Sequence, residues 1–112
     1  MVAVRAFNLA ETCRTPVVLL LDEIIGHVNE KVRLPERVEV AERKGPDMPP
    51  ERYLPYRHTE DAVPPMAAFG TGGYRFHVTG LAHDETGFPT NSSAVIDKLV
   101  RRLDRKIGRA HV

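Results

Sequence analysis

Two acidic residues and a histidine lie close together in the sequence near residue 25. Asp22, Glu23 and His27 combine two carboxylates with an imidazole, and these groups transfer protons in many enzymes. The structural alternative is that Asp22 caps the next turn and that His27 packs at an interface. We favour this alternative. The three residues are therefore candidate interface residues, and no catalytic residue is assigned.

A second polar cluster contains His77, His83, Asp84 and Glu85. These residue types suit a metal ion, but their spacing matches no standard zinc pattern, so we expect a surface loop with local hydrogen bonds and no metal site. The Gly70–Gly73 stretch lacks the Gly-Lys-Ser/Thr ending of a phosphate-binding loop, which favours a flexible turn. A small anion- or metal-binding domain built from this turn and the 83–85 loop remains an alternative.

Composition excludes several classes of protein. The chain has 112 residues, enough for one modest domain, and its net charge of +1 argues against a general nucleic-acid binder. The longest apolar run, Val17 to Leu21, is too short to cross a membrane, and no pattern typical of a signal peptide is present. The single cysteine, Cys13, excludes an internal disulfide and a four-cysteine cluster site, and its apolar neighbours favour a small core residue. We expect a cytoplasmic protein without nucleic-acid or membrane partners.

The elements that position the first cluster are predicted to be a helix and a buried strand. The run at 16–21 is continuously apolar after Pro16, which is typical of a strand buried on both faces of a parallel sheet. We expect the helix to pack beside this strand, so that Asp22 and Glu23 follow the strand's carboxyl end. The helix is predicted from an apolar stripe at helical spacing: Val2, Ala3, Ala6, Phe7, Ala10 and Cys13.

The rest of the chain is predicted to be a long connection, a short strand and a second helix. Seven of the 9 prolines lie within 35–65, which indicates an extended connection across a larger body. Alternating residues over 74–79 predict a strand, which we expect to form a second, looser unit with the last helix. Asn91, Ser92 or Ser93 should cap that helix. It combines an apolar stripe with a basic face expected to be solvated: Val95, Ile96, Leu99, Val100 and Leu103, against Lys98, Arg101, Arg102, Arg105 and Lys106.

The order of residues over 1–106 resembles a known family, the alpha subunit of 2-oxoacid:ferredoxin oxidoreductases, and within it the 2-oxoglutarate type. Cys13 and Val28 stand where the family has Tyr and Met, and these conservative changes leave the resemblance intact. The motifs that carry it, in order along the chain, are Ala6 to Glu11, Arg14 to Glu23, Gly26-His27, Pro64-Pro65-Met66, Phe69-Gly70, Tyr74 to Leu81, His83 to Glu85, Gly87 to Pro89 and Lys98 to Leu103.

The resemblance implies that the chain is an incomplete α/β fragment of a larger subunit. Residues 1–31 would be the helix–strand piece that closes a parallel-sheet, thiamine-pyrimidine-binding domain. Residues 32–73 would be a proline-rich extended connector. Residues 74–106 would be a strand, a loop and an amphipathic helix that lead to the next domain.

The resemblance also implies an activity. The family oxidatively decarboxylates 2-oxoglutarate or a related 2-oxoacid to its acyl-CoA and passes electrons to ferredoxin. It uses thiamine diphosphate, Mg and an iron–sulfur cluster, with coenzyme A as co-substrate. The residues that contact substrate lie upstream of this stretch in the family, and the Gly-Asp-Gly motif of the Mg-diphosphate site belongs to the beta subunit; this chain has no such motif. The implied role is a chain that binds no cofactor, is inactive alone and has the beta subunit as a partner. Asp22, Glu23 and His27 are candidates for the subunit or domain interface near the cofactor.

The last six residues, 107–112, are what a widely used sequencing-library adapter encodes in one frame. We interpret them as read-through from a short environmental, metagenomic DNA fragment, which would make Met1 an internal methionine. The alternative function, from another class, is a stand-alone protein–protein interaction module without catalytic activity. Such a module would dock through its connector and its basic helix.

Overall fold

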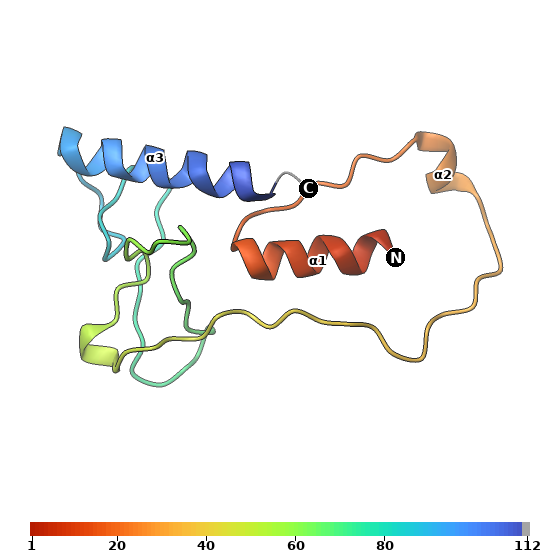
Figure 1. The fold of residues 1–112 in the computed structure, drawn as a ribbon, viewed down its shortest axis with the longest axis horizontal. Helices are drawn as coiled ribbons and strands as arrows, with labels where there is room; N and C mark the ends of the chain where they lie inside the picture. Colours follow the sequence, from red (N-terminus) through yellow and green to blue (C-terminus); the bar gives the residue numbers. More distant parts are fainter. Residues whose placement is uncertain (111–112) are drawn as a thin grey trace. The chain divides into compact units, whose positions relative to one another are not determined.

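The computed structural model describes residues 1–110, so His111 and Val112 of the predicted adapter read-through lie outside the described residues. The chain divides into two compact units, Met1–Glu42 and Arg43–Val112. Within residues 1–110 the regular elements are three α-helices, one 3₁₀ helix and one isolated β-bridge (Figure 1). The division falls within the stretch predicted to be a proline-rich connector.

The first unit begins with helix α1, Val2–Cys13, as the apolar stripe predicts. Arg14 ends it in the left-handed conformation, with φ 48° and ψ 52°, and its N–H donates to the carbonyl of Ala10. Cys13 is buried, which confirms it as a small core residue. An extended segment then leads to the short helix α2, Glu23–His27.

The predicted strand at 16–21 is extended, but it pairs with no other strand among residues 1–110. In this chain the segment is not buried on both faces, since Leu20 is 91% exposed, and its place in a parallel sheet stays a prediction. A strand needs neighbouring strands for its backbone hydrogen bonds, and the described chain offers none. One face of α1 still meets this segment, because both line a cavity of about 190 Å³: Ala3, Ala6, Phe7, Ala10, Val17 and Leu19.

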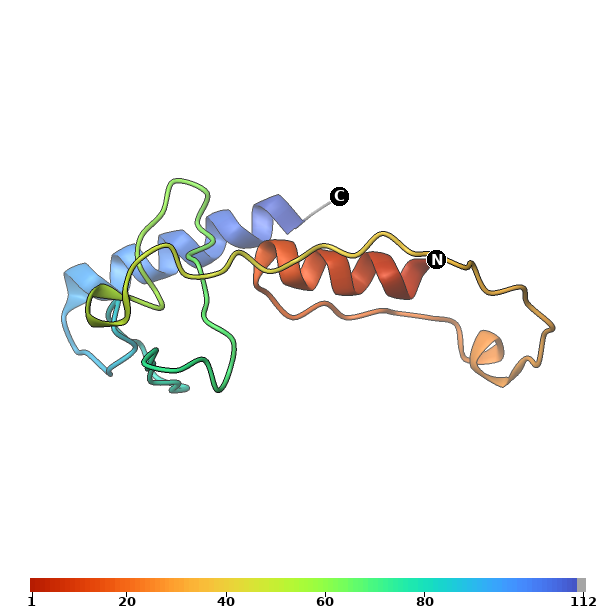
Figure 2. The same ribbon diagram turned by 90° about the horizontal axis from the view of Figure 1, so that it is seen from below.

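The chain returns from α2 along α1 as an extended segment (Figures 1 and 2). The side chain of Asn8 holds it there with two hydrogen bonds. Its Nδ2 donates to the carbonyl of Glu39 at 2.9 Å, and its Oδ1 accepts from the N–H of Ala41 at 2.9 Å. An asparagine amide carries both a donor and an acceptor, so it pairs with a backbone as a neighbouring strand would.

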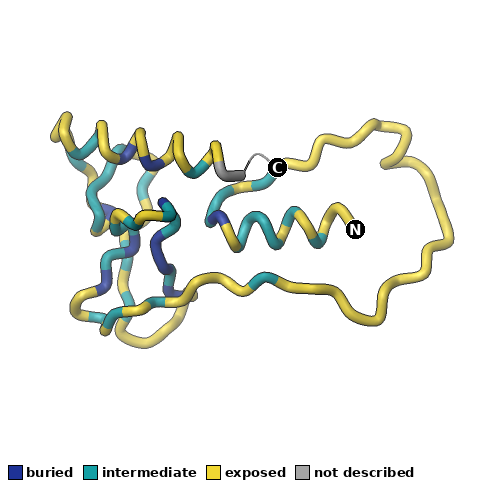
Figure 3. Tube along the Cα trace, viewed as in Figure 1, coloured by how far each residue is buried: buried dark blue, intermediate teal, exposed yellow. Residues whose placement is uncertain are grey.

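The second unit carries most of the buried side chains among the described residues (Figure 3). Its elements are the 3₁₀ helix η1, Pro50–Arg52, and helix α3, Ser93–Ala110. Most of these buried residues lie in 53–67, before the stretch predicted to form a looser unit. The prediction of a strand at 74–79 is not met, because this stretch pairs with no strand among residues 1–110 and a strand needs a neighbour for its hydrogen bonds. The buried residues are Tyr53, Pro55, Ala62, Pro64, Pro65, Ala67, Gly87, Leu99 and Arg102.

Helix α3 begins where the capping residues predict, because the carbonyl of Ser92 accepts from the N–H of Val95 at 3.1 Å and of Ile96 at 2.9 Å. Its inner face differs from the predicted stripe. Leu99 is buried as expected, whereas Val100 and Leu103 are exposed and Arg102 is buried in their place. Leu99 and Arg102 are three residues apart, so they share a face of the helix.

Candidate functional site

Helix α2 carries the three residues predicted as an interface. The Oδ1 of Asp22 accepts a hydrogen bond from the N–H of Ile24 at 3.0 Å, which confirms Asp22 as the helix cap. One turn apart on the helix, the Nε2 of His27 lies 3.8 Å from the Oε1 of Glu23. Both side chains are open to solvent, His27 at 78% and Glu23 at 91% exposed, so the pair has no enclosed space for acid–base chemistry.

The surroundings of α2 are apolar and exposed. The extended segment before the helix, the helix itself and the residue after it all present large aliphatic side chains to solvent. Exposed apolar groups next to charged ones are typical of a surface that another polypeptide covers. This surface, called the α2 patch below, consists of Val18, Leu20, Leu21, Ile24, Ile25 and Val28, with Glu23 and His27 beside them.

The second polar cluster does not converge on a common point. The Nδ1 of His83 lies 2.9 Å from the carbonyl oxygen of its neighbour Asp84, and His77 stacks on Phe88 with ring centres 4.9 Å apart. The Oε1 of Glu85 accepts from the N–H of His58 at 2.7 Å. Among residues 1–110, no three His, Cys, Asp or Glu side chains lie where they could hold a metal ion.

These groups instead hold the loop at 82–90. The hydroxyl of Thr86 donates to the carboxylate of Asp84 and, as the main cause, holds the pKa of Asp84 below its ordinary value. Main-chain bonds from Asp84 to Phe88 and from Thr90 to Ala82, both 3.0 Å, close the loop as an irregular hairpin. The prediction of a loop with local hydrogen bonds is confirmed.

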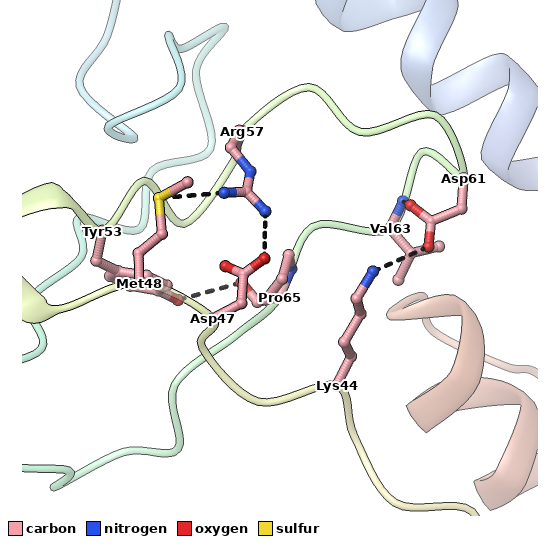
Figure 4. A network of polar contacts seen from close by, with 8 residues as sticks. All are labelled: Lys44, Asp47, Met48, Tyr53, Arg57, Asp61, Val63 and Pro65. Carbon is pink, nitrogen blue, oxygen red and sulfur yellow. Dashed lines mark hydrogen bonds and ion pairs between the residues drawn. The ribbon is translucent and has the colours of Figure 1, made fainter.

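A network of polar contacts that the sequence did not predict lies in residues 44–65 (Figure 4). The Nη2 of Arg57 donates to the Oδ2 of Asp47 at 2.7 Å, and its Nη1 donates to the Sδ of Met48 at 3.1 Å. The hydrogen bond from Arg57 is the main cause that lowers the pKa of Asp47. Nearby, the Nζ of Lys44 lies 3.4 Å from the Oδ2 of Asp61. Nothing in the spacing of these residues indicates which of them pair.

Two arginines of α3 hold the chain at 56–60 in place. The guanidinium of Arg102 donates from Nη1 to the carbonyl of Tyr56 and lies 5.8 Å from the centre of that residue's ring. The Nη2 of Arg105 donates to the carbonyl of Glu60 at 2.7 Å. The prediction of a solvated basic face is therefore wrong for Arg102, which is buried, whereas Arg105 is exposed as predicted. The sequence did hold a signal for Arg102, because a residue three positions after Leu99 lies on the same face of the helix as that apolar residue.

Two features of the described residues bear on a diphosphate group and an iron–sulfur cluster. At the 70–73 turn, the N–H of Thr71 donates to the carbonyl of Ala68 at 3.2 Å and the N–H of Tyr74 donates to the carbonyl of Thr71 at 3.3 Å, so these two donors already serve the turn. The chain's one cysteine is buried in the first unit, and a cluster takes several cysteine ligands, so this chain alone does not supply them.

Comparison with known proteins identifies the chain. Residues 1–102 match the family model described as pyruvate flavodoxin/ferredoxin oxidoreductase, thiamine diphosphate-binding. The chain belongs to this family. Members of this oxidoreductase family are similar to the chain over nearly its whole length, which agrees with the resemblance seen in its motifs.

One relative from this family is the 2-oxoglutarate synthase subunit KorA of Methanothermobacter thermautotrophicus, 53% identical over 111 residues, which covers 91% of this chain and 29% of the relative. Another is subunit alpha of 2-oxoacid:ferredoxin oxidoreductase 2 of Aeropyrum pernix, 34% identical and covering 93% of this chain and 16% of the relative. The chain thus spans less than a third of the curated relatives it matches.

A solved structure of the family is also similar to the chain. It is the 2-oxoglutarate:ferredoxin oxidoreductase of Magnetococcus marinus, solved with 2-oxoglutarate, coenzyme A and succinyl-CoA bound. It is 36% identical with a TM-score of 0.55, and the match covers 62% of this chain and 12% of that one. Within residues 1–110, no helix combines the length and apolarity that a membrane span requires.

Proposed function

We propose that this chain is part of the alpha subunit of a 2-oxoacid:ferredoxin oxidoreductase. The enzyme would oxidise 2-oxoglutarate or a related 2-oxoacid to its acyl-CoA in the cytoplasm and pass the electrons to ferredoxin. The observation that carries the proposal is the 53% identity to a 2-oxoglutarate synthase subunit over 111 aligned residues. In this proposal residues 1–31 complete a parallel-sheet thiamine-binding domain. Residues 32–73 are an extended connector, and residues 74–106 lead from it to the next domain.

The chain alone is proposed to be inactive. Thiamine diphosphate, Mg, an iron–sulfur cluster and coenzyme A belong to the whole enzyme in this proposal, and their ligands come from other parts of it. The support is chemical: one cysteine, N–H groups of Thr71 and Tyr74 that already donate within the turn, and a Glu23–His27 pair on α2 that is open to solvent. The contribution of this chain is to position other parts of the enzyme, not to transfer protons or electrons.

The α2 patch is the proposed contact with the beta subunit. Its aliphatic side chains are exposed, and burying them against another polypeptide would remove apolar area from water, at about 25 cal/mol per Å². Glu23 and His27 lie on the same short helix and supply charge at the rim, where paired charges favour one partner over others. Asp22 holds the helix in the geometry that presents both side chains.

A chimaeric enzyme tests the proposal. Residues 1–106 of this chain would replace the aligned stretch of the Methanothermobacter subunit, which would be expressed with its own beta subunit. We expect coenzyme A-dependent oxidation of 2-oxoglutarate, measured by reduction of ferredoxin or a viologen dye, and no activity from the 112-residue chain by itself. A chimaera that assembles and binds its cofactors but does not turn over any 2-oxoacid would contradict the proposed activity.

The contact with the beta subunit is tested in the same chimaera by the double variant Glu23→Gln/His27→Gln. Both side chains are exposed, so the variant should leave folding unchanged. We expect it to weaken binding of the beta subunit by about tenfold, since the lost interaction is on the order of 1 kcal/mol. The matched control is Glu30→Gln, an exposed acid outside the α2 patch. Equal affinity of the double variant and the control would reject the assignment of this surface.

A further inference from the structure

Met48 occupies an unusual position for a methionine, because its sulfur accepts a hydrogen bond from a charged group. The Nη1 of Arg57 lies 3.1 Å from the Sδ of Met48, and the side chain of Met48 is half-buried (Figure 4). A thioether sulfur is a weak acceptor. The Nη1 of Arg57 therefore makes only a weak hydrogen bond, and a stronger acceptor in the place of the sulfur would bind it better.

Both partners are held in place independently of this contact. The carbonyl of Met48 accepts from the hydroxyl of Tyr74 at 2.8 Å, and the ring of Tyr74 packs edge-on against Tyr53 at 5.2 Å between centres. The Nη2 of Arg57 donates to the Oδ2 of Asp47 at 2.7 Å, and the main-chain N–H of Arg57 donates to the carbonyl of Leu54 at 3.2 Å. The sulfur thus faces a fixed cation.

We propose that Met48 is a site of reversible oxidation, and that Arg57 binds the oxygen of its sulfoxide. The oxidant is a hydroperoxide. Its O–O bond breaks, the terminal oxygen forms an S–O bond, and the other oxygen leaves with a proton as water or an alcohol. The sulfur loses two electrons and the peroxide gains them. Only 3.1 Å separates the Sδ of Met48 from the Nη1 of Arg57, which leaves no room for an oxygen between them. The Met48 side chain therefore turns on oxidation, so that the sulfoxide oxygen replaces the sulfur as the acceptor for the guanidinium.

Met48 sulfoxide therefore has a consequence opposite to that of most methionine sulfoxides. Oxidation of a half-buried methionine ordinarily disrupts packing, because a polar group replaces an apolar one. At Met48 the new oxygen meets a charged donor, and hydrogen bonds to charged groups are the stronger ones. Oxidation should strengthen the link from 47–48 to Arg57. A methionine sulfoxide reductase would reverse the change.

Peroxide treatment of the 112-residue chain, with peptide mass mapping and urea unfolding, tests this. A Met66→Leu background removes the other sulfur that accepts from an arginine, since Arg43 donates to Met66 at 3.5 Å. We expect Met48 to be converted to its sulfoxide, and the urea midpoint of the treated protein to equal or exceed that of the untreated protein. With Arg57→Leu added, oxidation should lower the midpoint by about 0.5 M. Met48→Leu is the control in which peroxide leaves the midpoint unchanged.

Met48→Gln gives a second test without peroxide, because glutamine places a carbonyl oxygen near the position of the sulfoxide oxygen. With Arg57 present, Met48→Gln should have the same urea midpoint as wild type. In the Arg57→Leu background, Met48→Gln should lower the midpoint by about 0.5 M relative to Arg57→Leu alone. Two results would overturn the proposal. One is an equal fall of the midpoint on oxidation with and without Arg57; the other is an unmodified Met48 after the exposed Met1 is fully converted. The test requires no beta subunit and no turnover, so it is independent of the proposed function.

Discussion

Arg102 contacts Tyr56 twice, with a hydrogen bond from its guanidinium to the carbonyl of Tyr56 and with that guanidinium 5.8 Å from the centre of the ring. Tyr56 also contacts a histidine, because the ring of His83 lies 4.1 Å from that of Tyr56 between centres. The main chain is also fixed, since the N–H of Tyr56 donates to the carbonyl of Glu85 at 3.0 Å. Tyr56 thus joins helix α3 to the loop at 82–90.

Arg102→Leu should destabilise the second unit by about 2 kcal/mol, because it leaves the carbonyl of Tyr56 without its charged donor. Urea unfolding, followed by tyrosine fluorescence, measures the loss. The matched control is Arg101→Leu on the preceding residue of the helix. Its side chain is 75% exposed and pairs with Asp97 one turn earlier, so we expect a change of less than about 0.5 kcal/mol. Equal effects of the two substitutions would show that Arg102 does not hold the fold.

Gly87→Ala should be more damaging than its small size suggests. Gly87 has a φ of +96°, and a Cβ there would lie 2.3 Å from the carbonyl oxygen of His77 and 2.8 Å from the Cε2 of Tyr56. Both the conformation and the lack of space oppose a side chain, so we expect a loss of about 3 kcal/mol or more.

Gly80→Ala is the control for that substitution, since a Cβ at Gly80 meets no atom within 4 Å. We expect a change within about 0.5 kcal/mol there. Thermal unfolding of both variants distinguishes the two sites, and a Gly87→Ala protein as stable as Gly80→Ala would contradict the close approach of Gly87 to Tyr56.

Asn8→Ala should release the returning segment from α1. The Oδ1 of Asn8 is the acceptor for the N–H of Ala41, so its removal should speed hydrogen exchange at Ala41 by about fivefold, which corresponds to one hydrogen bond of about 1 kcal/mol. Asn8→Asp keeps the oxygen that accepts from Ala41 but loses the amide that donates to the carbonyl of Glu39. We expect its hydrogen exchange at Ala41 to lie between those of wild type and Asn8→Ala. Asn29→Ala, at an exposed position, is the control and should leave the exchange of Ala41 unchanged.

Acid should weaken the contact between Asp47 and Arg57. The folded pKa of Asp47 is lowered by the hydrogen bond from Arg57, so its stabilising effect is present above the ordinary carboxyl pKa of about 4. The effect is lost as the pH falls through the lowered pKa. Wild type should therefore exceed Asp47→Asn in urea midpoint at about pH 7 and match it at about pH 2. A difference that stays constant across this range would contradict the ion pair.

The sequence by itself determined the local features of this protein and its family. The apolar stripe of α1, the cap at Asp22 and the start of α3 after Ser92 depend on neighbours in the chain, and the structure confirms all three. The motifs over 1–106 identified the family for a related reason, because they are ordered along the chain and need no spatial information.

Only the tertiary structure decided which distant groups meet. Arg57 with Met48, Arg102 with Tyr56 and Asn8 with residues 39–41 join side chains to partners whose positions depend on how the loops close. The pairing of the segment at 16–21 depends on distant groups for the same reason. Its apolar residues specify an extended, buried state, but its hydrogen bonds must come from neighbouring strands, and within residues 1–110 none is present. Long-range partners, unlike helix periods and caps, are not encoded in the local pattern.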